Sequence, residues 1–226
     1  MKKLATLLVG VALATGANAA TVAFTDSFGL ATTNWTHAIG ASQFNGALGT
    51  LNSATFTFTD DIVQSFKGEN TGNSPDTLTP IAGAQFLFRR SLATLLSTTV
   101  SGAGTAFNAT AFDGLSDFAG TSGTVFANVT ANGTGTFTVT GAALAALIGS
   151  GTVGSAGYDV RAIGNGSIQT DNGNLDSSIS TQARYNLRLV YDFTPRTTTV
   201  PEPGSMALFG VALAGLAVLR RKALKA

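Results

Sequence analysis

Residues 183–193, ARYNLRLVYDF, show the clearest strand pattern in the chain. Apolar and polar side chains alternate along this stretch, and its apolar positions fall on one side of an extended chain: Tyr185, Leu187, Leu189, Tyr191 and Phe193. The opposite side carries mostly polar residues: Arg184, Asn186, Arg188 and Asp192. A period of two residues predicts a β-strand with one face buried and the other in water.

The same alternation recurs along the chain. Residues 21–28, 54–59 and 135–140 alternate between Thr or Ser and apolar residues, and residues 85–92, 124–129 and 158–163 are further candidate strands. Turn-forming clusters lie between them, at residues 70–75, at Asp113-Gly114 and at Asn172-Gly173. Only residues 142–148 could form about two turns of helix. Short strands without alternating helices favour an all-β, antiparallel β-sandwich over residues 20–194.

Composition narrows the classes of function. The 226 residues allow one domain of ordinary size. Six basic residues lie at the chain ends: Lys2, Lys3, Arg220, Arg221, Lys222 and Lys225. Seven of the 13 basic residues therefore remain against 12 acidic ones, a balance of 7 − 12 = −5. An acidic body disfavours nucleic acid as a partner. With no cysteine, disulfides, thiolate metal sites and cysteine nucleophiles are excluded.

The first 19 residues have the three parts of a secretory signal peptide. Lys2 and Lys3 give a positive start, residues 4–14 are apolar but too short to span a bilayer, and Ala17 and Ala19 are small residues that suit signal peptidase. We predict cleavage by signal peptidase after Ala19 and export of the chain.

The C-terminal residues predict a membrane anchor. Residues 204–219 are apolar and would form a helix about 24 Å long, against a hydrocarbon core of about 30 Å. The basic tail, residues 220–226, would remain on the cytoplasmic side and leave the body outside the inner membrane. Residues 195–203 form a linker in which Pro201 and Pro203 keep the backbone extended and remove two amide donors.

The end of the chain resembles the PEP-CTERM sorting signal of Gram-negative bacteria. The residues that carry the resemblance are the motif Pro201, Glu202 and Pro203, followed by the apolar run and then Arg220, Arg221 and Lys222. The resemblance implies an exosortase-type enzyme as processing partner. It also implies a precursor held transiently in the inner membrane, then a protein at the cell surface or outside the cell.

The body is similar to the choice-of-anchor E domain, a family of exported bacterial domains attached to different C-terminal anchors. The resemblance covers most of residues 20–194 and rests on these stretches: residues 24–27, Trp35, residues 43–51, 69–72, 112–114 and 117–120. The family name implies no activity and no catalytic residue.

Few residues are candidates for catalysis or metal binding. His37 is the single histidine, and we expect a strand residue with a satisfied hydrogen bond. Asp60 and Asp61 would point to opposite faces of a strand, and we expect a solvated strand end. Asp113 and Asp117 could bind calcium, as could a second group: Asp171, Asn172, Asn174 and Asp176. Neither group has EF-hand spacing, and a hairpin turn at Asn172-Gly173 is the simpler interpretation.

Four N-x-[ST] triplets begin at Asn34, Asn108, Asn128 and Asn132, and we treat them as products of composition. We therefore expect no catalytic residue, no cofactor and no metal ligand. The leading hypothesis is a non-enzymatic surface or matrix protein, structural or adhesive, associated through the PEP-CTERM resemblance with exopolysaccharide or biofilm. The alternative is a glycan-binding module or a small glycan-active hydrolase that uses carboxylates and an aromatic such as Trp35.

Overall fold

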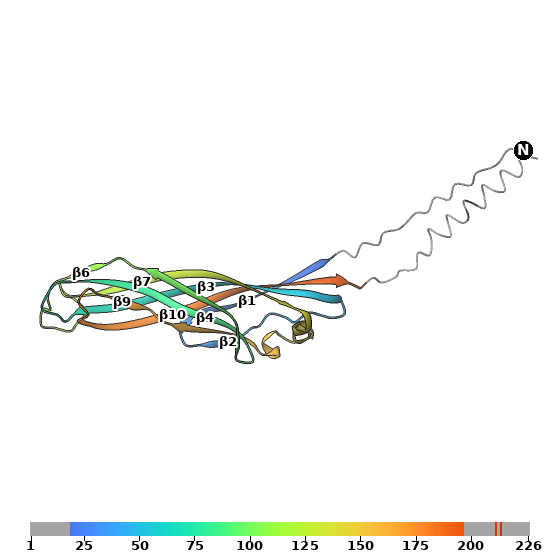
Figure 1. The fold of residues 1–226 in the computed structure, drawn as a ribbon, viewed down its shortest axis with the longest axis horizontal. Coiled ribbons are helices and arrows are strands. Elements are labelled where there is room, and N and C mark those ends of the chain that lie inside the picture. Colours follow the sequence, from blue (N-terminus) through green and yellow to red (C-terminus); the bar gives the residue numbers. More distant parts are fainter. Residues whose placement is uncertain (1–18, 197–210, 212, 214–226) are drawn as a thin grey trace, which may run out of the picture. The chain divides into compact units, whose positions relative to one another are not determined.

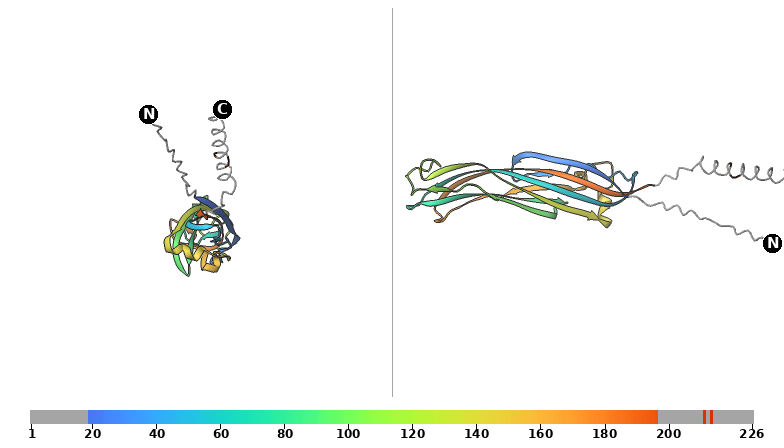
Figure 2. Two further views of the ribbon diagram at one scale, coloured as in Figure 1. Left: turned by 90° about the vertical axis from the view of Figure 1, so that its right-hand side faces the viewer. Right: turned by 90° about the horizontal axis from the view of Figure 1, so that it is seen from above.

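The structure is a computed structural model that describes residues 19–196, Val211 and Leu213 (Figure 1). The chain divides into two compact units, Met1–Pro195 and Arg196–Ala226. The described part of the first unit is an antiparallel sandwich of two sheets, as the alternation predicts (Figure 2).

The first sheet contains four long strands in the spatial order β1, β10, β3, β7. Their bounds are β1 Ala20–Thr32, β3 Gly49–Asn70, β7 Gly123–Thr140 and β10 Leu175–Pro195. All neighbours are antiparallel. The two longest, β3 with 22 residues and β10 with 21, extend for about 70 Å at 3.3 Å per residue. β1 begins and β10 ends at one end of the sandwich, and β6 and β9 lie near the other end, which we call the distal end (Figure 1).

The second sheet has the order β2, β8, β4, β5, and two short strands also pair with β4. The bounds are β2 Thr36–Ala38, β4 Asp76–Arg90, β5 Ala93–Ala103, β6 Phe107–Ala109, β8 Tyr158–Gly164 and β9 Ser167–Gln169. Pro80 has no amide hydrogen to donate in the middle of β4. The strands on both sides of β4 are interrupted near this position, between β5 and β6 and between β8 and β9.

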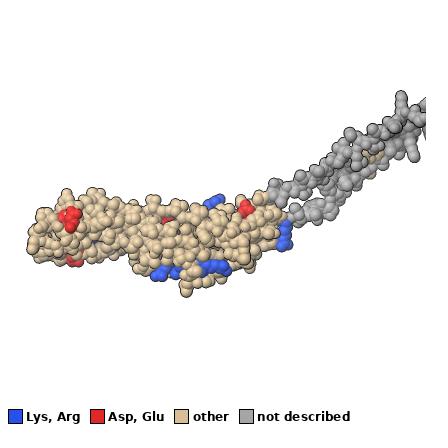
Figure 3. All heavy atoms as spheres, in the orientation of Figure 1, with Lys and Arg blue, Asp and Glu red and all other residues tan. Residues whose placement is uncertain are grey.

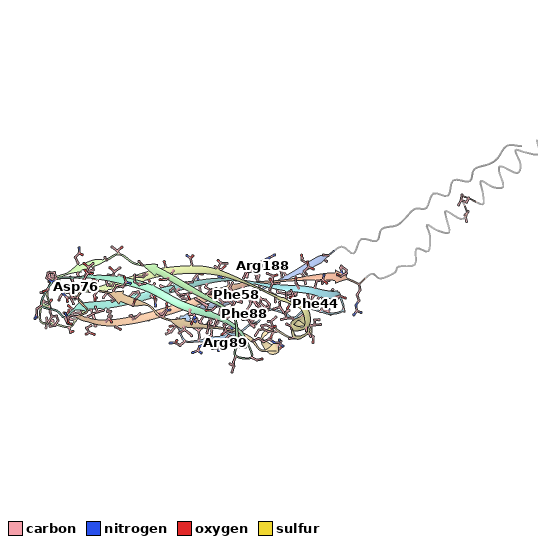
Figure 4. The ribbon with its side chains drawn as sticks, viewed as in Figure 1. Phe44, Phe58, Asp76, Phe88, Arg89 and Arg188 are labelled. Carbon is pink, nitrogen blue, oxygen red and sulfur yellow. The ribbon has the colours of Figure 1, made fainter. Side chains whose placement is uncertain are left out.

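The core lies between the two sheets. The odd-numbered residues of β10 from Ala183 to Phe193 are buried, which confirms the predicted face. Phe56 and Phe58 of β3 pack against Phe88 of β4, with ring centroids 4.9 and 5.0 Å apart, and Phe88 also stacks on Tyr158. Figure 4 shows Phe58 and Phe88 between the sheets. Such aromatic packing supplies much of the buried area of a sandwich.

Six of the seven predicted strands lie within observed ones, and the seventh, residues 85–92, runs past the end of β4. Residues 124–129 and 135–140 are one strand, β7, in which an extra residue makes a bulge near Asn128, whose φ is 57°. The prediction of strand through residue 92 was wrong, because β4 ends at Arg90. Ser91 and Leu92 both have positive φ and turn the chain into β5. The two halves of β7 looked separate because a bulge interrupts the period of two.

Helical structure within the described residues is short. Residues 142–148, the one helical candidate, fall largely in the 3₁₀ helix η1, Gly141–Leu147, which buries Leu144 and Leu147. A second 3₁₀ turn, η2, spans Gly154–Ala156. The hairpin predicted at Asn172-Gly173 was wrong, because this turn links β9 of the second sheet to β10 of the first. Gly173 does take the positive φ, 75°, that the turn requires.

Candidate functional site

The outer face of the first sheet is an ordered array of polar side chains. Because antiparallel partners share a face, the register aligns these residues in rows across β1, β10, β3 and β7. One row is Ser27, Asn186, Thr59 and Thr134, and the next is Thr25, Arg188, Thr57 and Thr136. Most of these side chains are exposed and the rest half-buried. We call this array the hydroxyl face.

An open groove of about 640 Å³ runs along this face. Its lining includes six residues of the two rows: Thr25, Ser27, Thr57, Thr59, Asn186 and Arg188. Hydroxyl and amide groups can each both donate and accept hydrogen bonds. The groove can therefore match a ligand that is itself rich in hydroxyl groups.

Charge on the hydroxyl face is sparse. Arg184 forms an ion pair with Asp61, with 3.1 Å between Nε and Oδ2, whereas Arg188 makes no ion pair within the described residues. Figure 4 labels Arg188 on the side of β10 away from the core ring of Phe58. In Figure 3 most of the visible surface is uncharged, and acidic side chains are seen at the distal end and in smaller patches in the middle and toward the other end. Arg188 thus adds one free cation to a mainly neutral groove.

The residues predicted to direct export lie mainly outside the described part of the chain. This holds for Ala17 and for the whole sorting signal: Pro201, Glu202, Pro203, Arg220, Arg221 and Lys222. Ala19 is described; it is exposed and directly precedes β1, so cleavage after it would leave Ala20 as the first strand residue. Signal cleavage stays a prediction. Of the predicted membrane helix, 204–219, only Val211 and Leu213 are described, and no helix within the described residues has the length and apolarity to cross a membrane.

His37 belongs to a partly buried hydrogen-bond chain that joins the two sheets. The hydroxyl of Tyr185 donates to Oδ2 of Asp26 at 2.7 Å and lies 2.9 Å from Nδ1 of His37. The phenol has one proton and gives it to Asp26, so Nδ1 of His37 is the donor to the Tyr185 oxygen. Burial, together with the bond to Asp26, raises the pKa of Tyr185. The expectation that His37 is a strand residue with a satisfied hydrogen bond is confirmed.

Aromatic side chains are used by the core rather than by the groove. Trp35 is half-buried and packs against Phe28 at 4.7 Å and Tyr185 at 6.0 Å between ring centroids. All three tyrosines, Tyr158, Tyr185 and Tyr191, are buried. The stacking platform that the alternative hypothesis assigned to Trp35 or a tyrosine is therefore absent from this groove.

The prediction that Asp60 and Asp61 form a solvated strand end was wrong, although they do point to opposite faces. Both lie in the middle of β3. Asp61 faces outward to Arg184, whereas Asp60 is 1% exposed and accepts a hydrogen bond of 2.6 Å from the hydroxyl of Thr98. Burial raises the pKa of Asp60 to about 6. Nothing in the local composition indicated this buried acid, but its position in phase with Phe56 and Phe58 did.

The acidic residues considered for calcium are spread over the distal loops. Asp113 and Asp117 accept hydrogen bonds from the backbone amides of Leu115 and Ala119. Oδ2 of Asp176 accepts one from the hydroxyl of Ser116 at 3.2 Å. Within the described residues, no three His, Cys, Asp or Glu side chains gather closely enough to hold a metal ion.

The described body is an antiparallel β-sandwich with a polar groove on one face. The C-terminal segment indicates how the protein is sorted, because residues 199–222 match the PEP-CTERM protein-sorting motif. This motif marks an exported protein that is sorted through exosortase from a membrane-anchored precursor. The match covers the segment and not the sandwich.

No curated protein sequence matches this chain. Among solved structures, the chain is similar to one of the IBDV viral particle, with 12% identity and a TM-score of 0.13, covering 88% of this chain and 47% of that one. It is also similar to structures of infectious bursal disease virus strains Gt and Gx, at 10% and 11% identity, with TM-scores of 0.14 and 0.15. These cover 95% and 92% of this chain and 53% and 52% of the viral ones, so the chain spans about half their length.

Proposed function

We propose that this exported protein is a non-enzymatic, adhesive or structural component of the cell surface or extracellular matrix of a Gram-negative bacterium, and that its hydroxyl face binds exopolysaccharide. The observation that carries the proposal is the alignment of hydroxyl, amide and guanidinium groups in rows across four strands. A rigid sheet holds these groups at fixed spacings before binding, which reduces the entropy lost when an extended chain of sugars docks.

The resemblance of the body to the choice-of-anchor E domain agrees with this proposal, since such domains are exported and carry interchangeable anchors. The sorting motif supports a destination outside the inner membrane, where polysaccharide is available. Association with exopolysaccharide and biofilm is what the PEP-CTERM resemblance implies, and the polar groove supports it.

Hydrolysis of glycans is less well supported than binding. A glycosidase needs two carboxyl groups that flank the bond to be cleaved. One acidic residue, Asp26, lines the groove, and its carboxylate accepts the hydroxyl proton of Tyr185. We therefore place the protein among binding modules.

Co-sedimentation with exopolysaccharide tests the proposal. Purified full-length protein in mild detergent is mixed with polysaccharide isolated from the producing cells, and the bound fraction is measured over a range of protein concentrations. The variant Thr57→Val/Thr59→Val keeps the shape and β-propensity of the side chains but removes two hydroxyl groups from the groove. Two lost hydrogen bonds of about 1 kcal/mol each would weaken binding about 30-fold.

The matched control is Thr94→Val/Thr99→Val, which makes the same change at two exposed positions of β5 in the second sheet. We expect this control to bind as the wild type does. The proposal fails if the wild type does not bind the polysaccharide, or if both double variants lose affinity equally.

A further inference from the structure

Glu69 is the second-to-last residue of β3. It is a buried acid whose carboxylate has no hydrogen-bond partner among the described residues. The residue is 0% exposed, and neither of its carboxylate oxygens forms a hydrogen bond within the described residues. Burying a carboxylate without hydrogen bonds or a counter-charge is costly, and buried charges in proteins are paired or coordinate metals. A cation bound beside Glu69 would offset this cost.

The residues beside Glu69 increase its need for a cation. Its register partner on β10 is Asp176, so the two acidic side chains lie on the same face about 5 Å apart at Cβ. Like charges in this arrangement are destabilising. The nearby ammonium group of Lys67 lies 5.9 Å from the centre of the Phe118 ring and forms no ion pair with Glu69.

The loop between β6 and β7 lies against this pair, of which Glu69 is buried and Asp176 is exposed, and it brings a further oxygen atom. Ser116 donates a hydrogen bond to Asp176. In the same loop the carboxylate of Asp113 lies against Gly120, since a methyl group added to Gly120 would be 2.8 Å from Oδ2 of Asp113. On the other side, Gly123 is the register partner of Glu69, and a methyl group there would overlap the Glu69 carboxylate. The absence of a side chain at Gly123 thus leaves room for the Glu69 carboxylate.

We infer that Glu69 and Asp176 bind one calcium ion beneath the loop at residues 110–122. Calcium takes six to eight oxygen ligands, which include backbone carbonyl groups, hydroxyl groups and water as well as carboxylates. Two carboxylates balance the charge of the ion, and the loop supplies neutral oxygens. The inference is independent of polysaccharide binding, because the hydroxyl-lined groove contains neither Glu69 nor Asp176.

Calorimetric titration of CaCl₂ into purified full-length protein, first treated with EDTA, tests this inference. We expect one ion per chain with a Kd of about 0.1–1 mM, the range of extracellular calcium modules. Glu69→Gln, which is nearly isosteric, should weaken binding at least tenfold, to about 1–10 mM or beyond. In EDTA the same variant should have a higher Tm than the wild type, because a neutral amide costs less to bury than an unpaired charge.

Asp171→Asn is the control, since it removes an exposed acid from the same end of the sandwich without touching Glu69. It should bind calcium with the wild-type affinity. Absence of calcium binding by the wild type at 10 mM would overturn the inference, and so would wild-type affinity in both Glu69→Gln and Asp176→Asn. An equal loss in Asp171→Asn would also overturn it, since binding would then follow the charge of the whole distal end.

Discussion

The hydroxyl of Thr98 on β5 donates a 2.6 Å hydrogen bond to the buried carboxyl group of Asp60 on β3, and this contact crosses from one sheet to the other. Oδ1, the other oxygen of Asp60, has no hydrogen-bond partner in the described part of the chain. Apolar side chains surround the group, among them Phe58, Phe86 and Leu96. One hydrogen bond does not compensate the ionised carboxylate for the water that it loses on burial, so the pKa of Asp60 rises to about 6.

This raised pKa predicts a specific pH dependence of stability. Protonation is favoured in the folded state, so the contribution of Asp60 is fully present below its unfolded pKa near 4 and is lost as pH rises through 6. The loss amounts to about 3 kcal/mol by pH 8. Asp60→Asn removes the titrating group and should remove this decline. Urea denaturation of both proteins at pH 4, 5, 6, 7 and 8 measures it, and a parallel decline in the variant would contradict the prediction.

Tyr185→Phe should destabilise the protein by about 1–3 kcal/mol, because Asp26 loses its donor and His37 loses its acceptor inside the sandwich. Tyr191→Phe is the matched control. The Tyr191 hydroxyl donates to the neutral backbone carbonyl of Ser42 at 3.0 Å, and its loss should cost about 1 kcal/mol. Equal effects of the two variants in urea denaturation would show that the bond to the Asp26 carboxylate adds nothing.

Phe88→Ala should cost about 3–5 kcal/mol, the usual range for removing a buried aromatic ring. The ring of Phe88 contacts residues of three strands, including Phe58, Phe137 and Tyr158. Phe88→Leu retains more of the volume and should cost less. The thermal midpoints of the two variants should rank in that order below the wild type, and identical midpoints would show that the core collapses around the missing ring.

Much of the sandwich could be predicted from the sequence, because polar and aromatic residues alternate along its strands. Thr and Arg lie on the outer face, and Phe and Tyr lie on the inner face. The buried acids could not be recognised from local composition, since the composition around Asp60 and Glu69 resembles that of a strand end. The alternation does identify Asp60, because Phe56, Phe58, Ile62 and Phe66 are all even-numbered inner residues and Asp60 lies in phase with them. The first half of β4 was missed because Pro80 and Gly83 disfavour strands, and long-range pairing with β5, β6, β8 and β9 overrides that local preference.

The alignment of side chains across the hydroxyl face depends on the register between strands, so local sequence patterns could not predict it either. Thr57 and Thr59 could be assigned to an outer face from their alternation with phenylalanine. Their positions opposite Arg188 and Asn186 follow from pairing between strands more than 120 residues apart in the chain. Sequence alone therefore predicted polar strands, and the structure shows which polar groups meet.

Signal cleavage predicts the mature N-terminus. If signal peptidase recognises Ala17 and Ala19, secreted protein should begin at Ala20, the first residue of β1. N-terminal sequencing of the secreted protein measures this directly. Mature protein that still contains Lys2 and Lys3 would rule out cleavage at this position.

The PEP motif lies within the matched segment, residues 199–222. Pro201 and Pro203 restrict the backbone to an extended shape, and Glu202 offers one negative charge that a basic pocket can select. Glu202→Ala should therefore leave the apolar segment inserted but block its removal by exosortase. The variant should accumulate in the inner-membrane fraction as a band larger than the mature protein.

The basic tail has a separate task, so a second variant should fail at a different step. Arg220, Arg221 and Lys222 should keep the end of the chain on the cytoplasmic side of a marginally long apolar segment. Replacing all three with Gln should release unprocessed protein from the membrane, whereas Glu202→Ala retains it there. Fractionation and the size of the mature band distinguish the two, in cells with and without exosortase. If the wild type and Glu202→Ala mature identically, or if the wild type matures without exosortase, the segment acts only as an anchor.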